Sequence, residues 1–379
     1  MNFMKLNSYL DGLAECGIPA CDLAVSYRGE SVYRHCAGYA DIEKKRLVSK
    51  NDLYFVFSIS KITTCVAAMQ LVERGKLRLD DPVSKYILSF AYLTVKQSNG
   101  GVAPAQNVMT VEHLFTMTGG LSYDLRAPAL KRALQMSGGK TLDMISAMAE
   151  SPLEFEPGTS FRYSLCHDVL AGVVEAVTGV RFADYVQQNI FDPLGMINTG
   201  YHLPEEFRPR LSTMYRHVHG IMRATPIPCS NEPYVYSDAY DSGGAGLYSC
   251  TDDQIKLMTV LANGGKTADG YCLLRPETIR MMGENRLIDS VRPYFEPNRL
   301  YGYGWGLCGR AHENPRISGS LSSVGEFGWD GAAGSFGLID PERQIGVFFA
   351  MQVLGCTYAY HIVHPTLRNL IYETLNKSI

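Results

Sequence analysis

The apolar residues of this chain repeat with two spacings, one typical of strands and the other typical of helices. Strand-like stretches at residues 22–27 and 31–37 flank Arg28-Gly29-Glu30, which predicts a β-hairpin near the N-terminus. A longer run at residues 59–74 stops at Gly75 and predicts a helix. The apolar residues that recur at core spacing within this run are Ile62, Val66, Met69 and Val72.

Helical patterns fill the middle of the chain, and strand patterns return in its last third. Further helices are expected at residues 142–150, 168–177, 182–190, 252–263 and 361–376. Strands are expected at residues 303–308, 326–329, 335–339 and 345–352. Residues 206–240, rich in proline and tyrosine, are predicted to be irregular.

Strands near both ends of the chain, with helices between them, predict one sheet built from both terminal regions. We therefore expect a discontinuous α/β sandwich domain that comprises residues 1–80 and 206–379. Residues 81–205 would form a mainly helical domain. The cleft between the two domains is the expected ligand site.

Composition excludes several classes of function. The net charge of the 379 residues is −3 and no long run of one sign occurs, so neither nucleic acid nor an anionic membrane is an expected partner. No apolar run approaches the length needed to cross a bilayer. Residues 1–10 are typical of an amphipathic helix and not of a signal peptide, which favours a cytoplasmic location.

The cysteines and histidines do not form a metal-binding pattern. The ten cysteines are scattered without a C-x-x-C pair, so we expect reduced thiols that pack as small hydrophobic side chains. The nine histidines also lack ligand spacing, and neither a metal nor another cofactor is expected. The oligomeric state remains open.

Ser58-Ile59-Ser60-Lys61, at the start of the predicted helix 59–74, is the most informative segment of the chain. A serine and a lysine three residues apart share one face of a helix. A lysine packed among apolar residues is favoured in its neutral form, in which it can accept the proton of the serine hydroxyl. Outside such a context the same spacing is common, and an N-cap serine with a surface lysine would explain it.

Two other segments could complete a catalytic site. Tyr163 lies on a predicted loop before a helix and could direct its hydroxyl into the cleft, although it could equally be a core tyrosine. Residues 328–334 are mostly small, and such a strand edge allows a close approach of substrate. A backbone N–H from this edge, paired with that of Ser58, could form an oxyanion hole, and a tight turn is the alternative.

The order of these segments resembles that of the class C β-lactamase family of serine hydrolases, also called the β-lactamase-related or family VIII esterase group. The resemblance extends from about residue 18 to residue 355. The segments that carry it are residues 57–61, 71–83, 114–121, 157–164, 242–247 and 328–331.

This resemblance implies a role for each candidate residue. Ser58 would be the nucleophile, Lys61 the base or proton relay, and Tyr163 the second proton-transfer group. The backbone N–H groups of Ser58 and Ala332 would form the oxyanion hole. The implied fold is α+β and β-lactamase/transpeptidase-like, with an antiparallel sheet flanked by helices plus an all-helical lobe.

The chain departs from the β-lactamases and D,D-peptidases at two motifs. Leu165 stands where their Tyr-x-Asn motif has an asparagine that binds the substrate amide, and His167 could point the same way. Trp329 stands where their third motif has a cation for the substrate carboxylate. With Asp330 and Gly331, these residues are the predicted substrate contacts, and the tryptophan resembles the esterase and acyltransferase branch.

We therefore expect a serine hydrolase that cleaves carboxylic esters of small or medium acyl groups through a covalent acyl-serine. An acyltransferase, in which an alcohol or amine replaces water, is the alternative, because its acylation chemistry is the same. A D-amino-acid amidase or peptidase, a weak β-lactamase, and a non-catalytic binding protein on the same scaffold are further alternatives.

Overall fold

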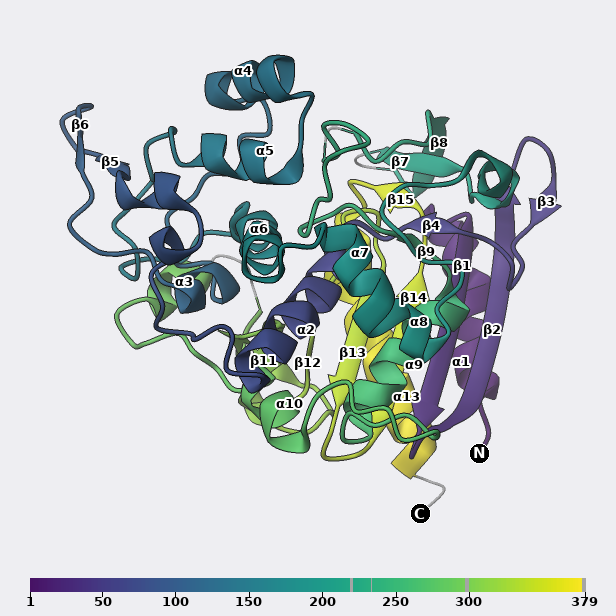
Figure 1. Ribbon diagram of the computed structural model, residues 1–379. Helices are drawn as coiled ribbons and strands as arrows, with labels where there is room; N and C mark the ends of the chain where they lie inside the picture. The colour runs from purple at the N-terminus through teal and green to yellow at the C-terminus, as the bar shows by residue number, and fades with distance from the viewer. Residues whose placement is uncertain (219–220, 233, 297–299, 377–379) are drawn as a thin grey trace.

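An antiparallel sheet of eight strands forms the centre of the computed structural model, which describes every residue except 219–220, 233, 297–299 and 377–379. The strand order is β10-β11-β12-β13-β14-β1-β2-β3 (Figure 1). The strands are β1 (Ala20–Tyr27), β2 (Glu30–Asp41), β3 (Arg46–Leu47), β10 (Tyr303–Gly306), β11 (Gly309–His312), β12 (Phe327–Gly328), β13 (Phe336–Asp340) and β14 (Ile345–Ala350). The prediction that both terminal regions build one sheet is thus confirmed.

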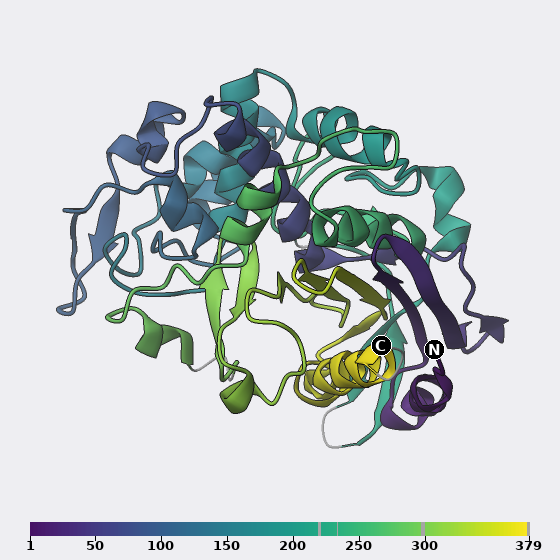
Figure 2. The ribbon, with the colours of Figure 1, turned by 90° about the horizontal axis from the view of Figure 1, so that it is seen from below.

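The sheet is buried on both faces by helices. Helices α1 (Met4–Asp11) and α13 (His364–Asn376) cover one face, where their leucines pack against Leu23, Val25 and Val347. Helices α2 (Ser60–Glu73) and α9 (Thr251–Ala262) lie against the other, where Ile62 and Met258 reach the β13 backbone (Figures 1 and 2). Each such apolar side chain contributes roughly 1.5–3 kcal/mol when fully buried.

A group of helices lies beyond α2, on the side away from the sheet (Figure 1). It includes α3 (Val111–Phe115), α4 (Pro128–Ser137), α5 (Thr141–Met148), α6 (Cys166–Thr178) and α7 (Phe182–Val186). Residues 60–71 of α2 are all buried, because the helix packs against the sheet on one side and against α6 and α7 on the other. The start of α2 is therefore held where the helices meet the sheet.

Residues 206–240 were predicted to be irregular, and this prediction is wrong. They contain the hairpin β7 (Met214–Val218) and β8 (Arg223–Ile227), and β15 (Val353–Leu354) pairs with β7 in parallel. The strand β7 gains its second partner, β15, from a segment more than one hundred residues further along the chain, which a local sequence pattern does not report. The sequence analysis also missed α4, α10 (Pro276–Met282) and β11.

The remaining elements are short connections around the sheet and the helices. They are β4 (Tyr54–Phe55), β5 (Thr94–Lys96), β6 (Val102–Pro104), α8 (Asp192–Leu194), β9 (Tyr248–Ser249), α11 (Arg292–Phe295) and α12 (Pro315–Ser318). Across the described residues, every helix is too short or too polar to serve as a membrane span.

Candidate active site

Ser58 lies in a tight turn between β4 and α2. A 3₁₀ turn, Phe57–Ile59, leads directly into α2, and the serine is only 7% exposed. Phe57 has a φ of +45°, in the left-handed region that costs a residue with a side chain about 1–3 kcal/mol. Its ring packs in an apolar cluster with Leu53 and Phe55, which holds the turn in place.

Lys61 lies one helical turn after Ser58 and points back toward it. Its Nζ atom is 3.2 Å from the Ser58 Oγ atom and donates to the carbonyl oxygen of Gly244 at 2.7 Å. The side chain is 1% exposed, so few water molecules can reach the amine. The predicted pairing of the serine and the lysine is therefore present in the structure.

The glycine-rich segment at residues 242–247 presses its backbone against this lysine. A Cβ atom on Gly244 would overlap an Asp168 carboxylate oxygen and would lie 3.3 Å from Lys61 Nζ, so no larger residue fits. The Asp168 carboxylate in turn accepts hydrogen bonds from Ser242 Oγ at 2.7 Å and Tyr240 Oη at 3.0 Å. Burial, followed by the Asp168 charge, raises the pKa of Tyr240, which therefore stays a neutral donor.

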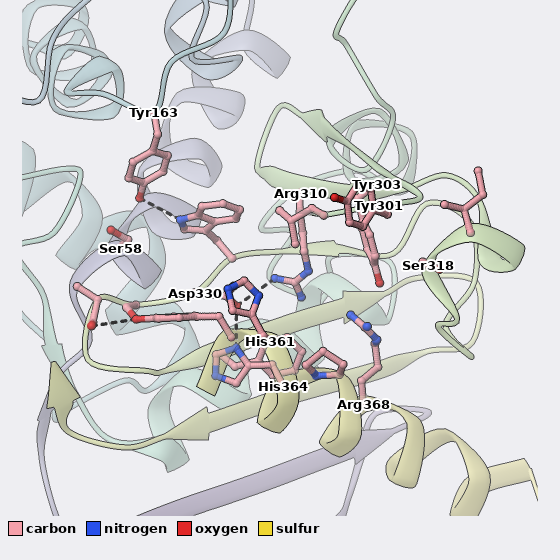
Figure 3. A pocket seen from close by; sticks show the side chains of 18 of the residues that line it. Ser58, Tyr163, Tyr301, Tyr303, Arg310, Ser318, Asp330, His361, His364 and Arg368 are labelled. Carbon is pink, nitrogen blue, oxygen red and sulfur yellow. Dashed lines mark hydrogen bonds and ion pairs between the residues drawn. The ribbon is translucent and has the colours of Figure 1, made fainter. Parts of the chain in front are cut away.

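Tyr163 presents its ring to Lys61 and its hydroxyl to the pocket. Lys61 Nζ is 4.7 Å from the centre of the Tyr163 ring, and Trp329 Nε1 donates to the Tyr163 hydroxyl at 2.9 Å. In Figure 3 this hydroxyl points toward the end of the pocket that holds Ser58. The second and third predicted segments thus meet beside Ser58.

Tyr123 is a pocket residue that sequence reasoning missed. Its ring stacks on that of Tyr163, with centroids 5.7 Å apart and planes 7° from parallel. Burial, then the nearby Tyr163, raises the pKa of Tyr123, and contact with the Ser58 hydroxyl acts in the opposite direction. A neutral phenol therefore adjoins the Ser58 hydroxyl, and only the position of Tyr123 two residues after the segment 114–121 could have drawn attention to it.

The third segment brings its backbone to the turn that holds Ser58. A Cβ atom on Gly331 would overlap the carbonyl oxygen of Val56, so the two stretches of backbone are in direct contact. Tyr360 Oη donates to the carbonyl oxygens of Gly331 and Ala332, at 2.9 Å each. Among the described residues no carbonyl accepts from the Ala332 N–H, which leaves this donor available to a ligand.

Asp330 lines the pocket as an ion-paired carboxylate. Its oxygen accepts from Arg310 at 3.3 Å and lies 3.5 Å from His364 Nδ1. Burial opposes its ionisation, but Arg310 and His364 more than offset this, and the pKa of Asp330 lies below its usual range. The carboxylate is thus charged at neutral pH and is held by protein groups.

These segments enclose a pocket of about 610 Å³, a size suited to a small or medium organic molecule. Of the predicted site residues, Ser58, Tyr163, Trp329, Asp330, Gly331 and Ala332 line it. Lys61 lies directly beneath the Ser58 hydroxyl. The other walls come mainly from aromatic side chains and from α13; they include Tyr123, Tyr234, Tyr301, Tyr303, Phe336, Tyr360, His361 and Arg368.

Leu165 and His167 do not reach this pocket, which corrects their prediction as substrate contacts. Leu165 lines a separate small cavity with Leu121 and Met148. His167 is fully buried on α6, and its Nε2 donates to the carbonyl oxygen of Phe115 at 3.1 Å. Burial, then the charge of Lys61, lowers the pKa of His167 to about 3. Both side chains face the helical core because α6 starts immediately after Leu165.

Comparisons with known proteins identify a family and relatives for this chain. A family model described as beta-lactamase matches residues 6–356. Esterase EstB from Burkholderia gladioli is 31% identical over 349 residues, which cover 85% of this chain and 82% of that esterase. The solved structure of EstCE1, a hydrolase with promiscuous acyltransferase activity, has a TM-score of 0.79 and 26% identity, with 97% of this chain and 98% of that chain covered.

Simvastatin synthase (LovD) from Aspergillus terreus has a TM-score of 0.80 at 21% identity and covers 99% of both chains, a likeness that shows the fold alone. The fold predicted from the sequence is therefore confirmed. Because the family model spans nearly the whole chain and an esterase relative exceeds 30% identity, this chain belongs to the β-lactamase family of serine hydrolases.

Proposed function

We propose that the protein hydrolyses carboxylic esters of small or medium acyl groups through a covalent acyl-Ser58 intermediate. The observation that carries this proposal is the 3.2 Å separation of Lys61 Nζ and Ser58 Oγ beside an aromatic pocket. Two groups at this distance can exchange a proton, which is what an unactivated hydroxyl needs to become a nucleophile.

Acylation begins with attack of Ser58 Oγ on the ester carbonyl carbon. Lys61 Nζ takes the hydroxyl proton as the new C–O bond forms. The N–H groups of Ser58 and Ala332 donate to the developing oxyanion, the second of these being free of other carbonyl partners among the described residues. The phenol of Tyr163 then protonates the departing alkoxide, and the acyl group remains on Ser58.

Deacylation reverses these proton transfers. Water enters the position left by the alcohol and gives a proton to Tyr163 as its oxygen attacks the acyl carbon. Ser58 Oγ then leaves and recovers its proton from Lys61, so that both groups return to their starting states. The Trp329 hydrogen bond at 2.9 Å occupies an acceptor site of Tyr163 and orients its hydroxyl for both transfers.

Reaction with a fluorophosphonate probe tests this function. We expect the wild-type protein to be labelled once, at Ser58, and the Ser58→Ala variant to remain unlabelled by intact-mass measurement. 4-Nitrophenyl esters of increasing acyl length then define the preferred acyl group. An unlabelled wild-type protein with no ester turnover would instead favour a non-catalytic binding protein on this scaffold.

An acyltransferase activity is the second candidate, supported by the likeness to EstCE1 over 97% of this chain. A pocket of about 610 Å³ has room for an acyl group and an acceptor alcohol together. Turnover of a 4-nitrophenyl ester in the presence of an alcohol distinguishes the two candidates. Formation of the new ester in excess over free acid supports transfer, whereas free acid alone supports hydrolysis.

We also propose that the substrate is a small molecule and that the protein works in the cytoplasm. All ten cysteines are free thiols, most of them buried, as is usual in a reducing compartment. Fractionation of the native cells is the test. Recovery with a cytoplasmic marker is the expected outcome, and recovery outside the cell membrane would contradict the location.

A further inference from the structure

The pocket extends well beyond the catalytic residues, as far as the C-terminal helix α13. Figure 3 shows Ser58 at one end of this space and Arg368, on α13, at the other. Aromatic side chains line the stretch between the two ends; they include Tyr163, Trp329, Phe336 and Tyr303. A ligand that spans the pocket therefore lies against aromatic side chains and the Asp330–Arg310 ion pair between Ser58 at one end and the cation of Arg368 at the other.

Arg368 is a buried cation whose hydrogen-bonding capacity is largely unused. Its side chain lines the pocket although the residue is only 6% exposed, and its buried Nε atom has no hydrogen-bond partner. The guanidinium carbon lies 5.4 Å from the centre of the Tyr303 ring, a cation–π contact that uses none of the N–H donors. The charge of Arg368 acts on Asp330 at a distance, but in the described residues no carboxylate accepts its N–H groups, and buried donors left unpaired favour an anion from outside the protein.

The carboxylates of this region are already bound to another arginine. Arg310 donates to Glu326 at 3.2 Å and to Asp330 at 3.3 Å, and no ion pair of Arg368 occurs in the described part of the chain. Glu326 also accepts from Ser322 Oγ at 3.1 Å. The two arginines and two carboxylates have no net charge together. Both carboxylates, however, accept hydrogen bonds from Arg310, and neither accepts one from Arg368.

We propose that the substrate carries a carboxylate at the end remote from its scissile ester, and that Arg368 binds this carboxylate. This inference rests on the proposed ester cleavage at Ser58. A guanidinium matches a carboxylate with two parallel N–H···O hydrogen bonds, and a shielded site strengthens them. Trp329 supplies no charge beside the nucleophile, so the cation deeper in the pocket selects for longer anionic substrates.

Matched pairs of esters test the proposal and show which part of the substrate carries the charge. Mono-4-nitrophenyl esters of dicarboxylic acids from succinate to suberate place the carboxylate in the acyl part, and 4-acetoxybenzoate places it in the leaving group. The methyl ester of each compound is its neutral control. In the wild-type protein we expect kcat/KM to favour the carboxylate over its methyl ester at least tenfold in one of the two series.

Arg368→Gln should reduce this preference to within about threefold, because a charge-assisted hydrogen-bonded pair accounts for a tenfold change or more. Arg316→Gln is the matched control: it removes the same charge from an exposed site on α12, near the pocket, and should retain the preference. Fluorophosphonate labelling of each variant shows that its catalytic centre is folded. The absence of any preference in the wild type, or its survival in Arg368→Gln, would overturn the proposal.

Binding to Ser58→Ala separates this inference from the function on which it rests. We expect monomethyl esters of the preferred dicarboxylic acid to bind this variant at least tenfold more tightly than the dimethyl ester, by calorimetry. The additional change Arg368→Gln should abolish the difference. Equal binding of both esters would contradict the anion site. If the probe fails to label the wild type while the variant still binds the monomethyl ester selectively, only the catalytic function is contradicted.

Discussion

The indole Nε1–H of Trp329 donates a hydrogen bond of 2.9 Å to the hydroxyl of Tyr163. Trp329 follows β12 of the sheet, whereas Tyr163 precedes α6 in the helical region, so this bond joins the two sides of the pocket. The two rings also pack with their centroids 5.4 Å apart. The Trp329 indole thus fixes the orientation of the Tyr163 hydroxyl, the group to which we assign proton transfer in the proposed mechanism.

Trp329→Phe retains an aromatic surface and removes the N–H donor. Loss of one neutral hydrogen bond of about 0.5–1.5 kcal/mol should lower kcat for 4-nitrophenyl acetate by roughly 3- to 10-fold. A double-mutant cycle with Tyr163→Phe is the control, because the substitution should add little once the hydroxyl is gone. Independent, additive effects of the two substitutions would contradict the orienting role.

Lys61→Ala removes the amine that lies 3.2 Å from Ser58 Oγ. Loss of a general base should reduce the turnover of 4-nitrophenyl butyrate by about 10²- to 10⁴-fold. Lys131→Ala, a change at an exposed lysine of α4, should leave the rate unchanged. Near-normal turnover by Lys61→Ala would reject the proton transfer that the proposed mechanism assigns to this residue.

Nitrocefin should be turned over slowly or not at all. An uncharged tryptophan adjoins the nucleophile, and neither Leu165 nor His167 reaches the pocket to bind a substrate amide. The measurement is the change in nitrocefin absorbance at enzyme concentrations that hydrolyse 4-nitrophenyl esters readily. Efficient turnover would mean that other groups in the pocket replace the missing polar contacts.

Gly244→Ala places a methyl group against the Asp168 carboxylate and 3.3 Å from Lys61 Nζ. Since Gly244 also accepts the 2.7 Å hydrogen bond of Lys61, its displacement should move the amine away from Ser58. We expect kcat to fall at least tenfold, together with a loss of stability of about 1–3 kcal/mol from overpacking. Gly12→Ala, at the end of α1 with open space around it and a φ of −79°, is a control for stability and should retain full activity.

His167 should make the protein sensitive to acid. Folding lowers the pKa of His167 from 6.5 to about 3. Between these two pH values the imidazole is neutral in the folded protein and protonated in the unfolded chain. Above pH 6.5 His167 is neutral in both states and this loss of stability is absent. As the pH falls from 6.5 toward 3, the free energy of unfolding decreases by about 1.4 kcal/mol per pH unit.

Urea unfolding at pH 7.5, 6 and 5 measures this slope. His167→Gln should show a smaller decrease in the free energy of unfolding than the wild-type protein over the same range. The same substitution at the exposed His361 should leave the slope unchanged. Equal slopes in His167→Gln and the wild type would show that His167 is not the acid-sensitive group.

Local patterns in the sequence determined the elements that depend on neighbouring residues. The hairpin of β1 and β2, the helix α2 and the three-residue spacing of Ser58 and Lys61 were predictable, since helix and turn geometry repeats over a few residues. The order of the three catalytic segments was predictable as well, from their resemblance to a known family.

Only the tertiary structure decided which side chains share the pocket. His167 faces the Phe115 carbonyl and not the pocket, because the packing of α6 against its neighbours sets the rotation of this helix. Tyr123 and Arg368 enter the pocket from segments more than two hundred residues apart, and β7 pairs with β15 across more than one hundred residues. Such contacts depend on the packing of whole elements, and a local sequence pattern carries no record of them.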